Sequence, residues 1–155
     1  MSPLRTILVP IDFSEASQHA LGPAVELATR EHATVVLLHV LSHLPDIPAR
    51  LSFNIHFEVP EYRQALHAAA LDQLRQLDAA LPQGPVRQVR VEHGDPADEI
   101  VRIAAEIDAD LIVMSTHGRR GFGHLLYGSV TERVVRLAPC SVLCVRPKGR
   151  PRQGQ

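Results

Sequence analysis

The sequence has almost no net charge, few cysteines and no long apolar run. Its 155 residues carry a formal net charge of −1 at pH 7, so no overall basic field attracts DNA, RNA or an anionic membrane. No stretch approaches the roughly 18 consecutive apolar residues that a membrane-spanning helix needs. The first residues also lack the charged region, apolar segment and cleavage site of a secretory leader. We therefore expect a cytoplasmic protein that binds neither nucleic acid nor membrane.

The 2 cysteines and 9 histidines match no redox or metal motif. Cys140 and Cys144 are expected on the last strand, where residues four apart lie about 13 Å from each other, too far for a disulfide. The histidines show neither the His-Glu-x-x-His pattern nor another paired ligand spacing, so we expect no dedicated metal site.

Motifs of nucleotide-processing enzymes are missing as well. The P-loop pattern Gly-x4-Gly-Lys-Ser/Thr does not occur. The segment 10–14 contains neither the His-x-Gly-His motif nor the Ser-Gly-Gly motif of nucleotidyl-transfer and ATP-pyrophosphate enzymes on similar α/β scaffolds. We therefore expect no catalytic residues and no enzyme.

Length and composition indicate one globular domain with a basic tail. A chain of 155 residues can build one proper core but not two comfortable domains. Its hydrophobic content of 45% and charged content of 21% are ordinary for a globular protein. We expect residues 1–146 to form this single domain. Residues 147–155 continue a basic stretch without interleaved aromatics, which is typical of a solvated, frayed terminus.

Short apolar runs alternate with helical patterns along the chain. Strands are expected at 6–11, 34–40, 86–93, 111–115 and 141–145, of which 86–93 alternates like a half-exposed edge strand. Helices are expected after Ser14, over 61–81, from Asp95 with Pro96 in the first turn, and from about Ser129. Strands that alternate with helices predict a single open parallel sheet with helices on both faces.

The apolar spacing also predicts which helix faces are buried. In the first helix small residues recur on one face, namely Ala16, Ala20, Ala24, Leu27 and Ala28. Gly22 and Pro23 lie inside that helix and disfavour a straight course. In the last helix the residues expected to face inward are Val130, Val134 and Leu137. The proline-rich segment 41–60 reads as a long loop that covers a site or contacts a partner.

The stretch 109–134 carries the clearest indication of function. An apolar strand is followed by a loop with several glycines, Gly118, Gly121, Gly123 and Gly128. Glycines let backbone N–H groups turn toward a ligand and approach it closely. The helix that follows presents unpaired N–H groups and about half a positive charge at its N-terminus, which suits a phosphate.

Side chains in this stretch add to the expected anion site. The hydroxyls of Ser129 and Thr131 add donors, and Arg119 and Arg120 place positive charge at the rim. The alternative is that the glycines serve turn geometry alone and Ser129 is an N-cap.

A second stretch is expected to meet this loop. In open parallel sheets the ligand lies beyond the carboxyl ends of the strands, where the winding reverses. If the first strand neighbours the strand at 111–115, Asp12 and the loop from Ser115 to Ser129 face each other across that crevice. Asp12 could instead cap the first helix.

Four segments together resemble the universal stress protein family, from about residue 4 to 146. They are Val9-Pro10-Ile11-Asp12-Phe13-Ser14, Leu38-His39-Val40, Gly94-Asp95-Pro96 and Ser115-x2-Gly118-x9-Gly128-Ser129. The resemblance implies a Rossmann-like five-stranded sheet in the order 3-2-1-4-5 and a homodimer through the last strand, at about 141–146. In one branch it also implies bound ATP. That branch carries Gly-x2-Gly-x9-Gly followed by Ser or Thr, so Ser115 replaces the first glycine; a negative φ there would leave room for the nucleotide.

The resemblance also implies roles for individual residues. It places Asp12 on the ribose and the backbone of Val40 on the adenine. The complete set of expected nucleotide-binding residues is Pro10, Ile11, Asp12, Val40, Met114, Ser115, His117, Gly118, Arg119, Arg120, Gly121, Gly128, Ser129, Val130 and Thr131. His117 would reach a phosphate or Mg²⁺ or else close a turn, and the two arginines would contact the γ-phosphate or remain solvated.

We accordingly expect a dimeric stress-response or signalling module that binds ATP with Mg²⁺, hydrolyses it slowly at most, and has an unidentified protein partner. The alternative is a nucleotide-free dimer that acts through protein contacts, for which Ser115 is the main support.

Overall fold

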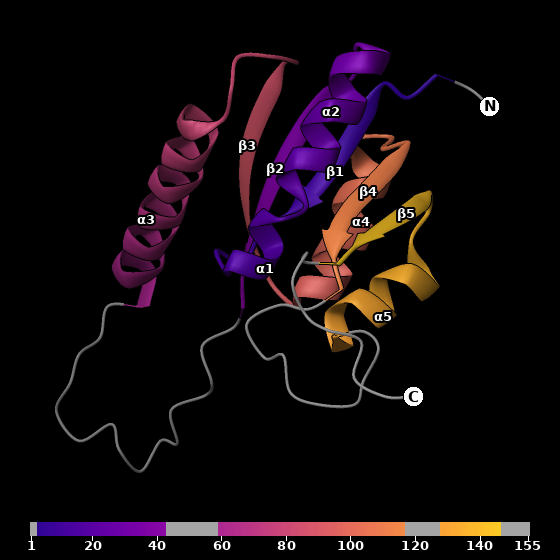
Figure 1. Ribbon diagram of the computed structural model, residues 1–155. Helices are drawn as coiled ribbons and strands as arrows, with labels where there is room; N and C mark the ends of the chain where they lie inside the picture. The colour runs from indigo at the N-terminus through magenta and orange to yellow at the C-terminus, as the bar shows by residue number, and fades with distance from the viewer. Residues whose placement is uncertain (1–2, 43–58, 117–127, 147–155) are drawn as a thin grey trace, which may run out of the picture.

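The computed structural model describes residues 3–42, 59–116 and 128–146, which form a five-stranded sheet covered by helices (Figure 1). The strands are β1 (Thr6–Pro10), β2 (Thr34–Leu41), β3 (Arg87–His93), β4 (Leu111–Ser115) and β5 (Ser141–Val145). The helices are α1 (Glu15–Gln18), α2 (Leu21–Glu31), α3 (Val59–Ala80), α4 (Pro96–Glu106) and α5 (Ser129–Leu137). All strands are parallel, in the order β3-β2-β1-β4-β5. The expected fold class, strand order and edge strand are confirmed.

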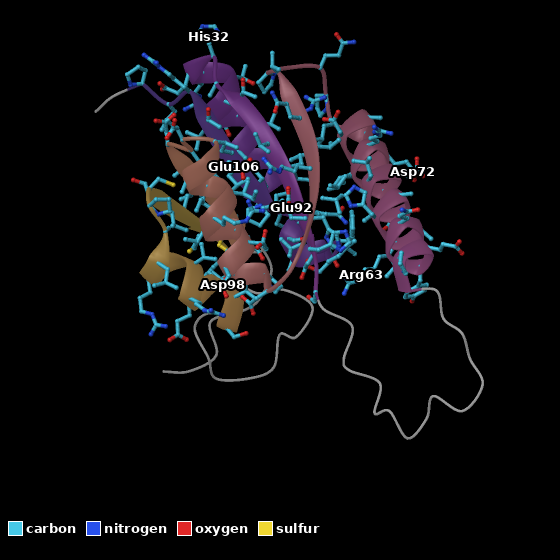
Figure 2. The ribbon with its side chains drawn as sticks, turned by 180° about the vertical axis from the view of Figure 1, so that it is seen from behind. His32, Arg63, Asp72, Glu92, Asp98 and Glu106 are labelled. Atoms are coloured by element: carbon cyan, nitrogen blue, oxygen red, sulfur yellow. The ribbon has the colours of Figure 1, made fainter. Side chains whose placement is uncertain are left out.

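Helices cover both faces of the sheet. On one face α2 and α3 pack against the buried side chains of Ile7, Val9 and Leu37. On the other face α4 and α5 pack against Leu8 and Ile112, among others. Figure 1 shows α2 in front of the sheet, and the reverse view in Figure 2 brings α4 to the front. Because neighbouring residues of the central strands are buried on opposite faces, these strands read as continuous apolar runs.

The first helix of the sequence analysis is two helices, so the single-helix prediction was wrong. Ser14 is the N-cap of α1, with its Oγ accepting from the Ser17 N–H at 3.1 Å. The chain then breaks at His19 and Ala20 before α2 begins at Leu21. This break places Pro23 in the first turn of α2, where a missing N–H costs no intrahelical hydrogen bond.

The boundaries of the last two helices bear on the site. Asp95 caps α4 and Pro96 is in its first turn, as expected. At α5 the N-cap is Gly128, so Ser129 is the first helical residue rather than the cap. Leu137 is 46% exposed, so the prediction that it faces inward was wrong, whereas Val134 is fully buried. Its spacing places Leu137 on the same face as Val130 and Val134, but it is the last residue of α5 and that end of the helix is not covered.

Parts of two predicted segments fall outside the described residues. The expected loop at 41–60 is described only at its ends, where Leu41 completes β2 and Val59 begins α3. The expected tail at 147–155 lies outside altogether. No helix in the described ranges is long and apolar enough to cross a membrane.

Candidate functional site

A cavity of about 750 Å³ opens at the carboxyl ends of β1, β2 and β4. Its described walls come from the turn after β1, the end of β2, the N-terminus of α4, the end of β4 and the N-terminus of α5. Because β1 pairs with both β2 and β4, the winding of the sheet reverses at this point. The structure therefore brings Asp12 and the first turn of α5 to one crevice.

Ten of the fifteen residues expected to bind a nucleotide line this cavity. They are Pro10, Ile11, Asp12, Val40, Met114, Ser115, Gly128, Ser129, Val130 and Thr131. The other five, His117, Gly118, Arg119, Arg120 and Gly121, lie outside the described residues.

The turn after β1 holds Asp12 at the cavity wall. Asp12 Oδ1 accepts a hydrogen bond from the N–H of Ser14 at 3.0 Å and another from the Ser14 hydroxyl. Ser14 is itself the cap of α1, so Asp12 supports the cap without being the cap. Between them Phe13 has a φ of 62°, a left-handed conformation that few residues adopt. The carboxylate thus belongs to a turn whose geometry is fixed by several contacts.

His39 of β2 also contacts the turn that holds Asp12. Its side chain is 8% exposed, and its Nδ1 lies 2.7 Å from the carbonyl oxygen of Ile11. Since a carbonyl oxygen only accepts, Nδ1 carries the hydrogen and donates it. The His39 ring also lies 4.4 Å, between ring centroids, from the ring of Phe13. His39 was not among the site residues expected from the sequence, although its place near the end of β2 put it at the ligand edge of the sheet.

The N-terminus of α5 offers backbone donors to the cavity. The N–H of Gly128 donates to the Thr116 carbonyl at 2.7 Å, and the first bond into the helix runs from Glu132 N–H to the Gly128 carbonyl at 2.9 Å. The N–H groups of Ser129, Val130 and Thr131 therefore precede the first helical hydrogen bond and have no acceptor within the helix. A glycine N-cap has no side chain that could occupy them.

Thr131 uses its hydroxyl within the protein. Its side chain is buried, and the hydroxyl donates to the carbonyl oxygen of Ser115 at 3.0 Å. A hydroxyl has one hydrogen to donate, so the expectation that the Thr131 side chain adds a phosphate donor was wrong. Its backbone N–H in the first turn of α5 is a donor of the kind expected there.

The N-terminus of α4 also reaches the cavity, but a carboxylate already occupies it. Asp95 Oδ1 accepts from the N–H groups of Ala97 and Asp98, each at 3.1 Å, and from Arg133 at 3.0 Å. An anion is therefore favoured at α5 rather than at α4. Gly94, Asp95 and Pro96 line this wall and were not among the expected site residues. They directly follow the carboxyl end of an edge strand, and this position could have indicated that they lie near the ligand.

Ser115 ends β4 in an ordinary strand conformation. Within the described ranges the non-glycine residues with positive φ are Phe13, His32 and Asp108, so the φ of Ser115 is negative. A serine can therefore replace the first glycine of the ATP-binding pattern here, because the backbone does not need a positive φ.

A model of the universal stress protein family matches residues 3–146. The chain belongs to the universal stress protein family. Universal stress protein MJ0531 of Methanocaldococcus jannaschii is 33% identical over 144 residues, which cover 92% of this chain and 82% of the relative.

Solved structures of this family are also similar to the chain. That of MJ0577 from the same organism has a TM-score of 0.80 at 30% identity, covering 96% of this chain and 99% of the other. A universal stress protein solved in complex with cAMP has a TM-score of 0.60 at 26% identity, covering 94% and 98%.

The two cysteines of this universal stress protein are both free thiols. Cys144 lies on β5, whereas Cys140 precedes the strand instead of lying on it as expected. Burial raises the pKa of both thiols, which keeps them protonated and unreactive near neutral pH.

Proposed function

We propose that this universal stress protein binds an adenine nucleotide, ATP with Mg²⁺, in the cavity between Asp12 and the N-terminus of α5. The observation that supports this most directly is a carboxylate and a helix N-terminus without a side-chain cap on the walls of one cavity. The volume of about 750 Å³ is typical of small-molecule sites, which hold roughly 300–1,000 Å³. The relative solved with cAMP supports the same class of ligand.

Each part of the nucleotide has a matching group in this arrangement. Phosphate oxygens would accept from the N–H groups of Ser129 and Val130, where the helix dipole favours negative charge. The carboxylate of Asp12 would accept from the ribose hydroxyls, and the backbone of Val40 would contact the adenine. Mg²⁺ would arrive with the phosphates and neutralise part of their charge.

We expect ATP hydrolysis to be slow at most, so the protein acts by binding rather than as an enzyme. The two carboxylates of the described cavity wall, Asp12 and Asp95, both accept hydrogen bonds from backbone N–H groups of helix starts. Each therefore already has a structural role, and we expect neither to act as the general base for an attacking water. Single-turnover measurement of phosphate release checks this: a rate near or above roughly 1 s⁻¹, at the low end of ordinary enzymes, would contradict it.

Binding itself is tested by isothermal titration calorimetry of the full chain with MgATP. We expect one nucleotide per chain, and at least tenfold weaker binding by Asp12→Asn. Asparagine keeps an oxygen for the Ser14 N–H but loses the charge and one acceptor. Asp72→Asn makes the same change on the exposed face of α3 and is expected to leave the affinity unchanged. Equal affinity in Asp12→Asn and wild type would remove the ribose role of Asp12.

We also propose a homodimer through β5. This strand lies at one edge of the described sheet, and Leu143 on it is 38% exposed. An exposed apolar edge strand readily pairs with another strand. Size-exclusion chromatography with light scattering should give twice the mass of one chain for the wild type and one chain mass for Leu143→Asp. Val86→Asp, on an exposed residue before β3 at the opposite edge, should stay dimeric.

A nucleotide-free dimer that acts through protein contacts is the second candidate. The observation that favours it is Ser115, whose side chain occupies part of the cavity wall where the ATP-binding pattern has glycine. If the calorimetric titration gives no heat up to about 1 mM MgATP, where binding is worth only about 4 kcal/mol, this candidate replaces the first.

A further inference from the structure

Two histidines far apart in the sequence meet between α3 and β3, in a groove that shares no lining residue with the cavity described above. His67 of α3 and His93 at the end of β3 face each other with Nδ1 of the first 3.2 Å from Nε2 of the second. The ring planes differ by 12° and the ring centroids are 5.4 Å apart. The centroids are much farther apart than the nitrogens, so the rings meet at these nitrogen-bearing edges. One ring donates an N–H and the other accepts it.

The spacing of the two nitrogens suits a shared metal ion. Two imidazole nitrogens bound to one Zn²⁺ at about 2.0–2.1 Å and near the tetrahedral angle lie about 3.3 Å apart. The observed 3.2 Å matches that spacing, and a turn of each ring by about 35° would point both nitrogen lone pairs at one ion. We propose that His67 and His93 form a two-histidine site for a divalent transition-metal ion that prefers imidazole nitrogen, with Zn²⁺ as the type.

The change on binding is a tautomer shift without redox chemistry. In the bound state His67 coordinates through Nδ1 and carries its hydrogen on Nε2, while His93 coordinates through Nε2 and carries its hydrogen on Nδ1. The ring that donates in the free protein moves one proton to its other nitrogen through water, and no proton is lost overall. Water would complete the coordination, and Gln64, one turn before His67, lines the same groove of about 520 Å³.

The site is accessible and joins two elements. His93 is exposed and His67 is half-buried, so an ion reaches both from solvent. Helix α3 packs against β3 and β2, and the ion would fasten this helix to the edge strand of the sheet. Metal binding is therefore expected to raise the thermal stability of the folded chain.

The positive charge of Arg63 distinguishes a cation site from an anion site in this groove. Its side chain lines the same groove, one turn before His67. A guanidinium opposes a cation and attracts an anion. Replacing Arg63 by glutamine should therefore strengthen Zn²⁺ binding a few-fold, whereas a phosphate-binding groove would bind phosphate less well after the same change.

The test uses the full chain without an affinity tag, treated with chelator and titrated with zinc sulfate by calorimetry. We expect one ion per chain, and at least tenfold weaker binding in each of His67→Gln and His93→Gln. The matched control is His32→Asn, at an exposed position on the end of α2 far from Arg63 (Figure 2), where asparagine tolerates the φ of 56°. That variant should bind zinc like the wild type.

Nitrogen-15 spectra of the imidazole rings make the outcome independent of how well the variants fold. In the wild type, zinc should shift the Nδ1 signal of His67 and the Nε2 signal of His93 together. Unchanged signals, or zinc binding that both glutamine variants retain, would overturn the proposal. Weaker zinc binding by Arg63→Gln would overturn it as well.

Discussion

The hydroxyl of Thr131 donates a hydrogen bond to the carbonyl oxygen of Ser115 across 3.0 Å, joining the first turn of α5 to the last residue of β4. A second bond of 2.7 Å, from the N–H of Gly128 to the carbonyl of Thr116, lies beside it. Together they hold the N-terminus of α5 over the ends of the strands. Two hydrogen bonds within the protein therefore position the backbone donors in the cavity before any nucleotide binds.

Replacing Thr131 by valine should destabilise the fold. Valine has nearly the same shape but no hydroxyl, so the buried Ser115 carbonyl loses this donor, at a cost of about 1–3 kcal/mol. Urea denaturation measures the loss. Thr131→Ser retains the hydroxyl and should stay close to the wild type, and equal stability of the valine and serine variants would show that the bond contributes nothing.

Replacing His39 by phenylalanine should disturb the turn that carries Asp12. The ring would still pack against Phe13, but the Ile11 carbonyl would lose its 2.7 Å donor, again worth about 1–3 kcal/mol. Asparagine presents an N–H near the place of Nδ1, so His39→Asn should retain more stability and more MgATP affinity than His39→Phe. Thermal unfolding with and without MgATP compares the two, and the opposite order would refute this role for His39.

Replacing Gly128 by aspartate should separate stability from nucleotide binding. Gly128 has φ −67° and ψ 155°, a conformation that suits an aspartate N-cap, so the free protein should gain a few tenths of a kcal/mol. The new carboxylate would occupy the N–H groups of α5 and repel phosphate, so MgATP should bind at least tenfold more weakly.

Gly128→Asn is the matched control for charge, because asparagine caps the helix without repelling phosphate. It should lose less affinity than the aspartate variant. If Gly128→Asp binds MgATP as tightly as the wild type, the phosphates do not lie at this helix end.

The periodicity of the sequence predicted the architecture because that architecture follows from local rules. Apolar runs at β1 and β4 indicated strands buried on both faces, and Asp95 with Pro96 marked the start of α4. The order of the strands came from the family resemblance and is confirmed. Given that order, the meeting of Asp12 with the start of α5 follows from topology alone.

The details that the sequence did not predict depend on contacts between elements. Whether Ser129 or Gly128 caps α5 is decided by where the chain leaves β4, and whether the Thr131 hydroxyl faces ligand or protein is decided by its distance from the Ser115 carbonyl. The pairing of His67 with His93 spans 26 positions and has no local signature. Pro23 disfavoured a straight helix, but the break between α1 and α2 lies before it, at His19 and Ala20.

The stability of the N-terminal strand should depend on pH through Asp110. Its Oδ2 accepts from the N–H of Arg5 at 2.7 Å and of Thr6 at 3.0 Å, and these bonds lower the pKa of the carboxyl below its ordinary value. Because the pKa is lower in the folded state than in the unfolded state, where it is about 3.9, the ionised carboxyl stabilises the fold above about pH 3.9. This stabilisation is lost as the pH falls through the folded pKa.

Asp110→Ala should therefore be less stable than the wild type at pH 7, by no more than about 1 kcal/mol because the group is partly solvated. The difference should shrink at pH 3, as measured by urea denaturation at both values. A difference that grows toward acid pH would contradict this account of Asp110.

A crystal structure of the full chain grown with MgATP tests the central claim most directly. We expect nucleotide density in the cavity, with phosphate oxygens at the N–H groups of Ser129 and Val130 and the ribose hydroxyls at Asp12. Density at another surface, or a cavity without nucleotide at saturating MgATP, would contradict it.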